Sequence, residues 1–307
     1  MAEVLLKAAS FIFIIFLAYG LKKLGLFRPG DHTVLVKIVM NLTLPAAVIC
    51  NFAETQLDLS MLILVLVGVA ANAVMLLTGL LLSRGGDRKK RALYAIASPG
   101  YNIGAFAMPF AQSFLGSVSV ASACLFDTGN AIMCTGGSYA ITDMLLNRNG
   151  SRENPIRMIL KRLSGSVPFL TYLLMLLLAV FKLRVPMAVA DFIRPIANAN
   201  AYCAMFMIGL MFELDLKPEA MKQIGTVVLV RNLAAMMLAL VCYFLLPLPI
   251  DVRRALAIIV FAPPSALTPA FTERCGGDPS MASCVSSLCI LTALFFMSIL
   301  LVIMNVA

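Results

Sequence analysis

The sequence has few charged residues and lacks the residue patterns that most catalytic and metal sites require. Charged residues make up 13% of its 307 positions, whereas hydrophobic residues make up 61% and the mean hydropathy is +0.96. His32 is the only histidine, the eight cysteines form no Cys-x-x-Cys pair, and there is no Gly-x-Ser-x-Gly element. The sequence therefore does not fit the usual metal-binding and serine-protease patterns, and its composition predicts an all-α polytopic membrane protein.

Ten apolar runs are each long enough to span a bilayer, which takes about 20 residues per crossing. They cover residues 4–20, 34–52, 60–82, 92–114, 118–146, 166–183, 188–212, 223–246, 254–273 and 282–305. The first run has no small-residue cleavage site, so we expect a membrane span and not a removable signal. The polar stretch 147–165 separates five spans from five, which predicts a first unit, 1–146, a cytoplasmic linker, 147–165, and a second unit, 166–307.

Lysine and arginine are distributed unevenly between alternate loops. The loops after odd-numbered spans hold sixteen: Lys22, Lys23, Arg28, Arg84, Arg88, Lys89, Lys90, Arg91, Arg148, Arg152, Arg157, Lys161, Arg162, Lys217, Lys222 and Arg274. The loops after even-numbered spans hold four: Lys182, Arg184, Arg253 and Arg254. Because short cytoplasmic loops hold the excess of positive charge, both termini are expected on the non-cytoplasmic side. We attribute the net charge of +9 to topology in preference to binding of RNA or lipid headgroups.

Two of the apolar runs are interrupted by residues that break helices. Residues 98–109 contain Pro99, Gly100, Gly104 and Pro109, and residues 261–269 contain Pro264 and Pro269. In hydrocarbon the freed backbone groups need partners, so such a break persists only where it is buried in protein or lines a watery cavity. Matched breaks in two halves indicate the midplane site of a transporter, where helix N-termini attract an anion; ordinary proline kinks are the alternative.

The two halves of the chain contain similar short sequences next to these breaks. Residues 116–122 align with 277–283 at an offset of 161 positions, with four identities in seven. The same offset brings Pro109 to within one position of Pro269. With five spans in each half, such a repeat must be inverted in the membrane, which is an arrangement that permits alternating access.

Amide and hydroxyl side chains lie in and near the breaks. Asn102 can donate hydrogen bonds to a carboxylate without a charge that would trap it, and Ser265 and Thr268 are candidate contacts from the second break. Four further polar residues either face the same cavity or join helices by hydrogen bonds, and we prefer the second role for them. They are Asn41, Thr43, Asn198 and Asn200.

Asp127 and Arg231 lie inside spans, where charge is costly and marks a candidate site. Asp127 is the candidate for coupling to a proton or a cation, with Asn130 nearly one turn further along the same face. A fixed structural anion is the alternative for Asp127. Arg231 is interpreted either as a counter-charge for Asp127 or for the substrate, or as a side chain that snorkels to the surface.

These motifs resemble those of the auxin efflux carrier family, which includes plant PIN-type exporters and bacterial permeases for malate and malonate. The similar segments are the first crossover, with Asn102 and Pro109; the second crossover, with Pro264 and Pro269; the second-span motif, 41–45; and the turn before the last helix, 274–278. The resemblance extends over nearly the whole chain. It implies two inverted five-helix repeats in which broken helices 4 and 9 cross, a fold similar to that of bile-acid symporters.

The resemblance also implies a scaffold of spans 1, 2, 6 and 7, which forms a homodimer, and a transport domain of spans 3–5 and 8–10. The anion site of the family would be lined here by Asn102, Ile103, Leu44 and Asn130. Two departures stand out: Ala107 replaces a glycine of many members, and the third span lacks the Asp and Lys of the accessory site in plant exporters. We therefore do not assume that the ion coupling of transport in the plant members applies to this chain.

The sequence thus predicts a secondary transporter that moves a small organic anion, such as malate, malonate or an auxin-like acid, by an elevator-type motion in a bacterial inner membrane. No cofactor or metal is expected, and the expected partners are the anion, the bilayer and a second copy of the chain, without nucleic acid. A sodium-coupled symporter of the bile-acid carrier type is the alternative. An intramembrane protease is disfavoured because Asp127 has no second catalytic aspartate, and a receptor because no soluble output domain is found.

Overall fold

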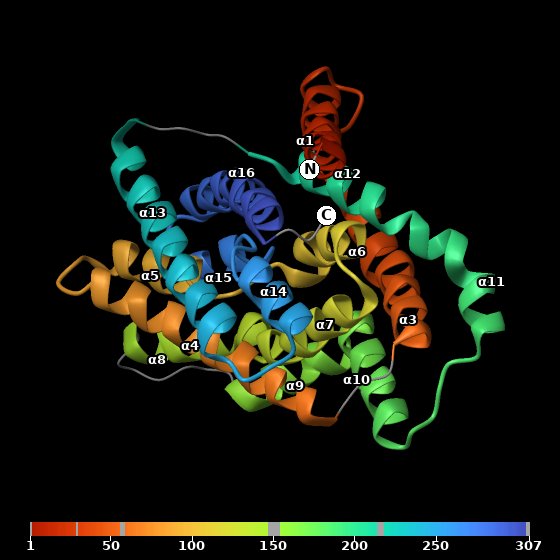
Figure 1. The fold of residues 1–307 in the computed structure, drawn as a ribbon. Coiled ribbons are helices and arrows are strands. Elements are labelled where there is room, and N and C mark those ends of the chain that lie inside the picture. The colour runs from red at the N-terminus through yellow and green to blue at the C-terminus, as the bar shows by residue number, and fades with distance from the viewer. Residues whose placement is uncertain (1, 29, 56–58, 147–153, 214–217, 305–307) are drawn as a thin grey trace.

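The computed structural model describes residues 2–28, 30–55, 59–146, 154–213 and 218–304, and every regular element in these ranges is a helix (Figure 1). The α-helices are α1 (Ala2–Lys23), α2 (His32–Ile38), α3 (Leu44–Glu54), α4 (Ile63–Leu82), α5 (Arg88–Ala97), α6 (Met108–Phe114), α7 (Ser117–Ile132), α8 (Ser138–Leu146), α9 (Pro155–Ser164), α10 (Val167–Val180), α11 (Met187–Asn198), α12 (Asn200–Met211), α13 (Pro218–Leu240), α14 (Ile250–Ile259), α15 (Thr268–Arg274) and α16 (Pro279–Ile303). Short π-helical segments, η1 (Val39–Thr43), η3 (Ile103–Ala107), η4 (Met133–Gly137) and η5 (Val241–Leu245), and a 3-10 turn, η2 (Leu59–Leu62), extend these helices.

The apolar helices are those of a multi-pass membrane protein. Within the described ranges, four stretches are long and apolar enough to cross a bilayer: His32–Glu54, Ser60–Leu82, Ala220–Leu245 and Pro279–Ile303. Helices α9 and α10 form a fifth apolar stretch, bent by 78°. The inverted arrangement of ten spans stays a prediction. Residues 147–153 of the predicted linker, with Arg148 and Arg152, and also Lys217, lie outside the described residues.

Helices α5 and α16 begin at side-chain caps. Asp87 accepts a hydrogen bond from the backbone N–H of Lys90 at 2.9 Å and starts α5. Asp278 accepts from the N–H of Ser280 at 2.8 Å and starts α16. A carboxylate at this position satisfies backbone donors that have no partner within the helix and interacts favourably with the helix dipole. These caps fix where α5 and α16 begin.

The helices pack in two groups. In one group α1 packs on α12, and α3 packs on both α10 and α11. In the other group α4 packs on α5 and α7, α6 on α7, α13 on α16, and α15 on α5 and α16. Figure 1 shows α3 and α11 on the right, α5 and α13 on the left, and α6, α14 and α15 between them. The two groups touch where α3 meets α7, α6 meets α12 and α1 meets α16. The short helices next to the breaks therefore lie centrally.

Glycine allows the closest contacts inside each group. A Cβ on Gly129 of α7 would overlap the carbonyl oxygen of Val65 on α4, and a Cβ on Gly68 would overlap that of Phe126. In the other group, a Cβ on Gly209 of α12 would overlap the carbonyl oxygen of Ile15 on α1. Without a hydrophobic driving force between helices in lipid, such close backbone packing is a main source of helix association.

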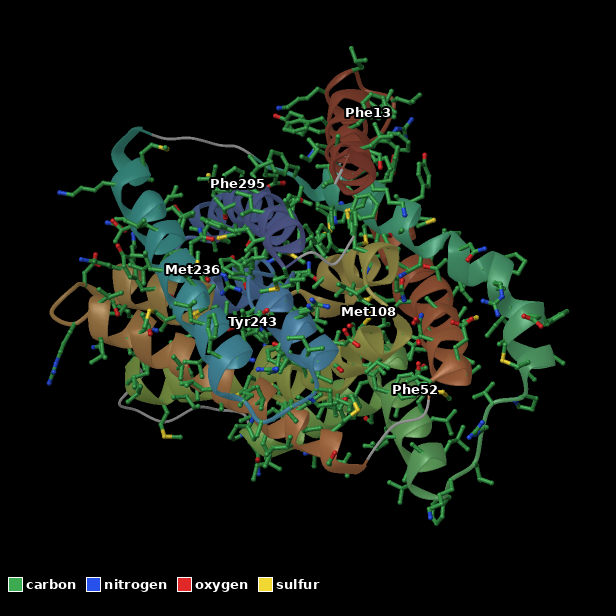
Figure 2. The ribbon with its side chains drawn as sticks, viewed as in Figure 1. Phe13, Phe52, Met108, Met236, Tyr243 and Phe295 are labelled. Carbon is green, nitrogen blue, oxygen red and sulfur yellow. The ribbon has the colours of Figure 1, made fainter. Side chains whose placement is uncertain are left out.

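Large apolar side chains lie both at the centre and on the outer surface, as expected for a protein surrounded by lipid. Figure 2 shows Met108 at the centre of the molecule and Phe13 on the outside of α1. Met108 is completely buried, whereas Phe13 and Phe295 are exposed. The buried residues around Met108 include much of α7 and α14 and form the largest core. The core thus surrounds the two breaks.

Candidate functional site

The two predicted breaks meet at the centre of the molecule. The backbone N–H of Asn102, between α5 and η3, donates a hydrogen bond to the carbonyl oxygen of Pro263, between α14 and α15, at 2.8 Å. Gly100 has a φ of +78°, and a Cβ there would lie 3.3 Å from Cys134 Sγ and 3.5 Å from Ser265 Cβ. Glycine therefore supplies both the left-handed conformation and the space that bring the breaks together.

Arg231 of α13 binds the backbone of both breaks at once. Its Nη1 donates to the carbonyl oxygen of Ser98, and its Nη2 donates to those of Gly100 at 3.0 Å and Ala262 at 2.8 Å. The guanidinium carbon lies 5.3 Å from the centre of the Tyr101 ring, at a distance typical of a cation–π contact. The residue is only 3% exposed, so it does not snorkel to the surface. A cation here satisfies carbonyls just beyond the C-terminal ends of α5 and α14.

Two buried asparagines hold the first break from the opposite side. The N–H of Gly100 donates to Asn72 Oδ1 at 2.7 Å, and the N–H of Tyr101 donates to Asn130 Oδ1 at 3.0 Å. Asn130 Nδ2 donates back to the carbonyl oxygen of Tyr101 at 2.8 Å, and Asn72 Nδ2 donates to Asn130 Oδ1 at 3.1 Å. The backbone groups freed by the break thus find partners in the side chains of α4 and α7.

Asp127 lies next to this network and is 8% exposed. Asn130 Nδ2 donates to Asp127 Oδ1 at 2.7 Å. The other carboxylate oxygen and the hydroxyl of Tyr172 both lie 3.7 Å from the position that a Cβ on Gly104 would occupy. No described residue forms an ion pair with Asp127, and Arg231 does not contact it. The carboxyl group is thus surrounded by neutral partners in the core.

Asn102 presents a side-chain amide that is not used by the fold. Its backbone caps η3, but among the described residues its side chain makes no hydrogen bond, and it is half-buried. Ser265 Oγ, half-buried in the second break, accepts from the N–H of Leu267 at 3.3 Å. Thr268 is buried at the first position of α15. Among the predicted contacts, the Asn102 amide is therefore the group left available for a ligand.

The predicted apolar contacts form the wall of the same region. Leu44 is fully buried, and its Cδ2 lies 3.0 Å from the position of a Cβ on Gly104. Ile103 is also buried and begins η3, which packs against η1. Gly104 therefore gives η1 and η3 the space to approach each other beside Asp127.

A second polar chain joins the two groups of helices. Thr43 Oγ1 donates to Asn200 Oδ1 at 2.9 Å, and Asn200 Nδ2 donates to Gln112 Oε1 of α6 at 2.9 Å. Gln112 and Asn198 line a pocket of about 290 Å³ between α3, α6, α11 and α12. Asn41 is exposed and donates to the carbonyl oxygen of Lys37, one turn earlier in its own helix. Three of the four further polar residues thus lie at this contact, and Asn41 lies outside it.

Two residues of the site were not among the predicted ones. Asn72 is a lone polar residue in an apolar run, and this isolation was the one sequence signal that pointed to it. Tyr172 carries no comparable signal, because a tyrosine is common in membrane helices. Among the described residues, no group of three His, Cys, Asp or Glu side chains is placed to hold a metal ion.

The family described as membrane transport protein matches residues 4–304, which is nearly the whole chain. No curated protein matches the chain.

Proposed function

Since the chain belongs to the membrane transport protein family, we propose that it is a secondary transporter of a small organic anion, such as a mono- or dicarboxylate. The observation that carries this proposal is the available amide of Asn102 where the two breaks meet. A carboxylate only accepts hydrogen bonds, so it needs a donor. An uncharged donor beside helix ends binds the carboxylate weakly enough for it to be released during transport.

The charges around the breaks favour an anion over a cation. The helical segment η3–α6 begins directly after Asn102, and α15 begins at Thr268, so two helix N-termini carry partial positive charge near the meeting point. The partial negative charge at the ends of α5 and α14 is neutralised by Arg231. The negative charge of Asp127 opposes the binding of an anion near these N-termini, and a proton bound to its carboxyl group removes that negative charge.

A proton is therefore the coupling ion that we propose, with Asp127 as its carrier. The alternative, a sodium-coupled symporter of the bile-acid carrier type, needs carbonyl oxygens at unwound helix ends as ligands. Arg231 already binds such oxygens on Ser98, Gly100 and Ala262. A resident guanidinium repels a second cation from the same oxygens, so this contact argues against sodium.

The two packing groups support an elevator-type motion. We propose that α1, α2, α3, α10, α11 and α12 form the scaffold and the homodimer contact, and that the helices of the other group move with the substrate. The hydrogen bond between Asn200 and Gln112 joins α12 to α6. It therefore crosses the boundary along which the two groups would slide past each other. In this proposal the protein lies in the bacterial inner membrane, with ten spans in two inverted repeats and both termini on the non-cytoplasmic side.

Thermal stabilisation across a panel of organic acids tests the proposal. Unfolding is followed with a thiol-reactive fluorophore, because the chain has no tryptophan and eight cysteines, of which six are buried. At 100 times its Kd, a ligand that binds only the folded state adds about 2.7 kcal/mol, which raises the Tm by about 5 °C. We expect this shift with carboxylates, larger at the lower of two pH values. Shifts with sodium or neutral solutes but with no acid would contradict the proposal.

A further inference from the structure

A pocket of about 470 Å³ lies between the basic end of α1 and the end of α12, away from the two breaks. It is bounded by the end of α1, the turn that leads to α2, the end of α12 and the first turn of α16, which contributes Ser280. The turn is held in place because the Phe27 ring packs on Phe206 with centroids 5.5 Å apart. The pocket therefore has walls fixed by the fold.

Positive charge gathers in this pocket. The cationic side chains of Lys22, Lys23 and Arg28 line it, and Glu213 is the acidic residue among the lining side chains. Lys22 Nζ is occupied, since it donates to the carbonyl oxygens at the end of α12 at 2.8 and 2.6 Å. Lys23 and Arg28 are exposed, and neither donates a side-chain hydrogen bond to another described residue. Lys23 Nζ lies 5.5 Å from the centre of the Tyr19 ring, a contact that leaves its hydrogen-bond donors free. Both cations are therefore available to a ligand that carries negative charge.

Exposed apolar side chains flank the pocket. Leu24 is 83% exposed and Leu26 is 67% exposed, and both lie in the turn that carries Arg28. In water, such exposure of adjacent leucines would be unfavourable. Next to a bilayer, the same leucines contact acyl chains, while lysine and arginine at a helix end reach the headgroup layer. The combination of a basic pocket and an apolar rim fits a molecule with a phosphate head and hydrocarbon chains.

We propose that this pocket binds the headgroup of an anionic phospholipid, with the phosphate held by Lys23 and Arg28 and the acyl chains lying over Leu24 and Leu26. Because Ser280 belongs to α16 and the other walls belong to α1, α2 and α12, the lipid lies between the two packing groups. The basic residues that the sequence attributes to topology alone thus have a second function. This site is independent of the transported substrate.

Native mass spectrometry of the delipidated full chain tests the proposal, with phosphatidylglycerol as the probe and phosphatidylcholine as the neutral comparison. Each basic side chain near an anionic headgroup contributes about a factor of five to binding. The double variant Lys23→Gln/Arg28→Gln is therefore expected to bind phosphatidylglycerol about 25-fold more weakly. The matched control, Arg84→Gln/Lys161→Gln, removes one exposed arginine and one exposed lysine outside the pocket and should change binding less than about twofold. Equal losses in the two double variants would overturn the proposal.

A second arm separates a lipid from a soluble phosphate. The variant Leu24→Ser/Leu26→Ser leaves every cation in place, and we expect weaker retention of phosphatidylglycerol but no change for inorganic phosphate. Both leucines are exposed, so this variant should fold as the native chain does. Displacement of the lipid by millimolar inorganic phosphate, or unchanged lipid retention in the leucine variant, would overturn the assignment to a lipid.

Discussion

Replacing Arg231 by methionine should destabilise the protein, because the guanidinium joins the backbone of both breaks. The side chain donates to Ser98, Gly100 and Ala262, and hydrogen bonds from a charged donor contribute about 1.5–3 kcal/mol each, or about 5–9 kcal/mol for three. Removal of a buried charge also recovers several kcal/mol of desolvation. The expected net loss is therefore about 3 kcal/mol, which lowers the Tm by about 6 °C for a chain of this length.

The assay is thermal unfolding in detergent with a thiol-reactive fluorophore. Arg253→Met is the matched control, because Arg253 Nη1 donates to one carbonyl oxygen, that of Tyr243, at 3.0 Å. We expect it to lower the Tm by about 2 °C. Arg231→Lys should fall between the two variants, since one ammonium nitrogen cannot take the places of both Nη1, which binds Ser98, and Nη2, which binds Gly100 and Ala262. If Arg231→Met unfolds at the same temperature as Arg253→Met, the reasoning about the double contact is refuted.

Three further predictions concern Gly129, Asn200 and Asp127. Gly129→Ala places a Cβ against the carbonyl oxygen of Val65 and should cost about 1–3 kcal/mol in thermal unfolding, whereas Gly225→Ala, which meets nothing within 4 Å, should cost none. Asn200→Ala leaves Thr43 and Gln112 without their partner and should lower the free energy of unfolding by about 1–3 kcal/mol. Asp127→Asn should abolish the pH dependence of anion flux into proteoliposomes; a full pH response in that variant would exclude Asp127 as the proton carrier.

The breaks themselves were predictable from the sequence, because proline and glycine act locally. Pro99, Gly100 and Pro264 lie in the breaks between helices, as expected, and the structure joins the two breaks through Asn102 and Pro263. The resemblance to the auxin efflux carrier family, drawn from the same residues, is confirmed by the family match. The structure was thus easiest to predict where motifs depend on backbone chemistry.

The role of Arg231 was not predictable in the same way. Its partners are carbonyl oxygens more than 30 and 130 positions away, on Ala262 and Ser98, and every residue has such an oxygen. Side-chain charge alone left three roles open for Arg231: a counter-charge for Asp127, a counter-charge for the substrate, or a side chain that snorkels to the surface. The same limit applies to Lys23 and Arg28, since their common pocket depends on the turn before α2 and on the end of α12.

The most direct test of the central claim is the affinity of the Asn102→Ala variant for the acid that best stabilises the native protein, measured by equilibrium titration. Loss of a hydrogen bond to a charged ligand costs about 1.5–3 kcal/mol, so we expect binding about 10- to 150-fold weaker. Asn41→Ala is the control, because that amide is exposed and bonds only within its own helix. Its affinity should equal that of the native protein. An unchanged affinity in Asn102→Ala would remove the meeting point of the two breaks as the anion site.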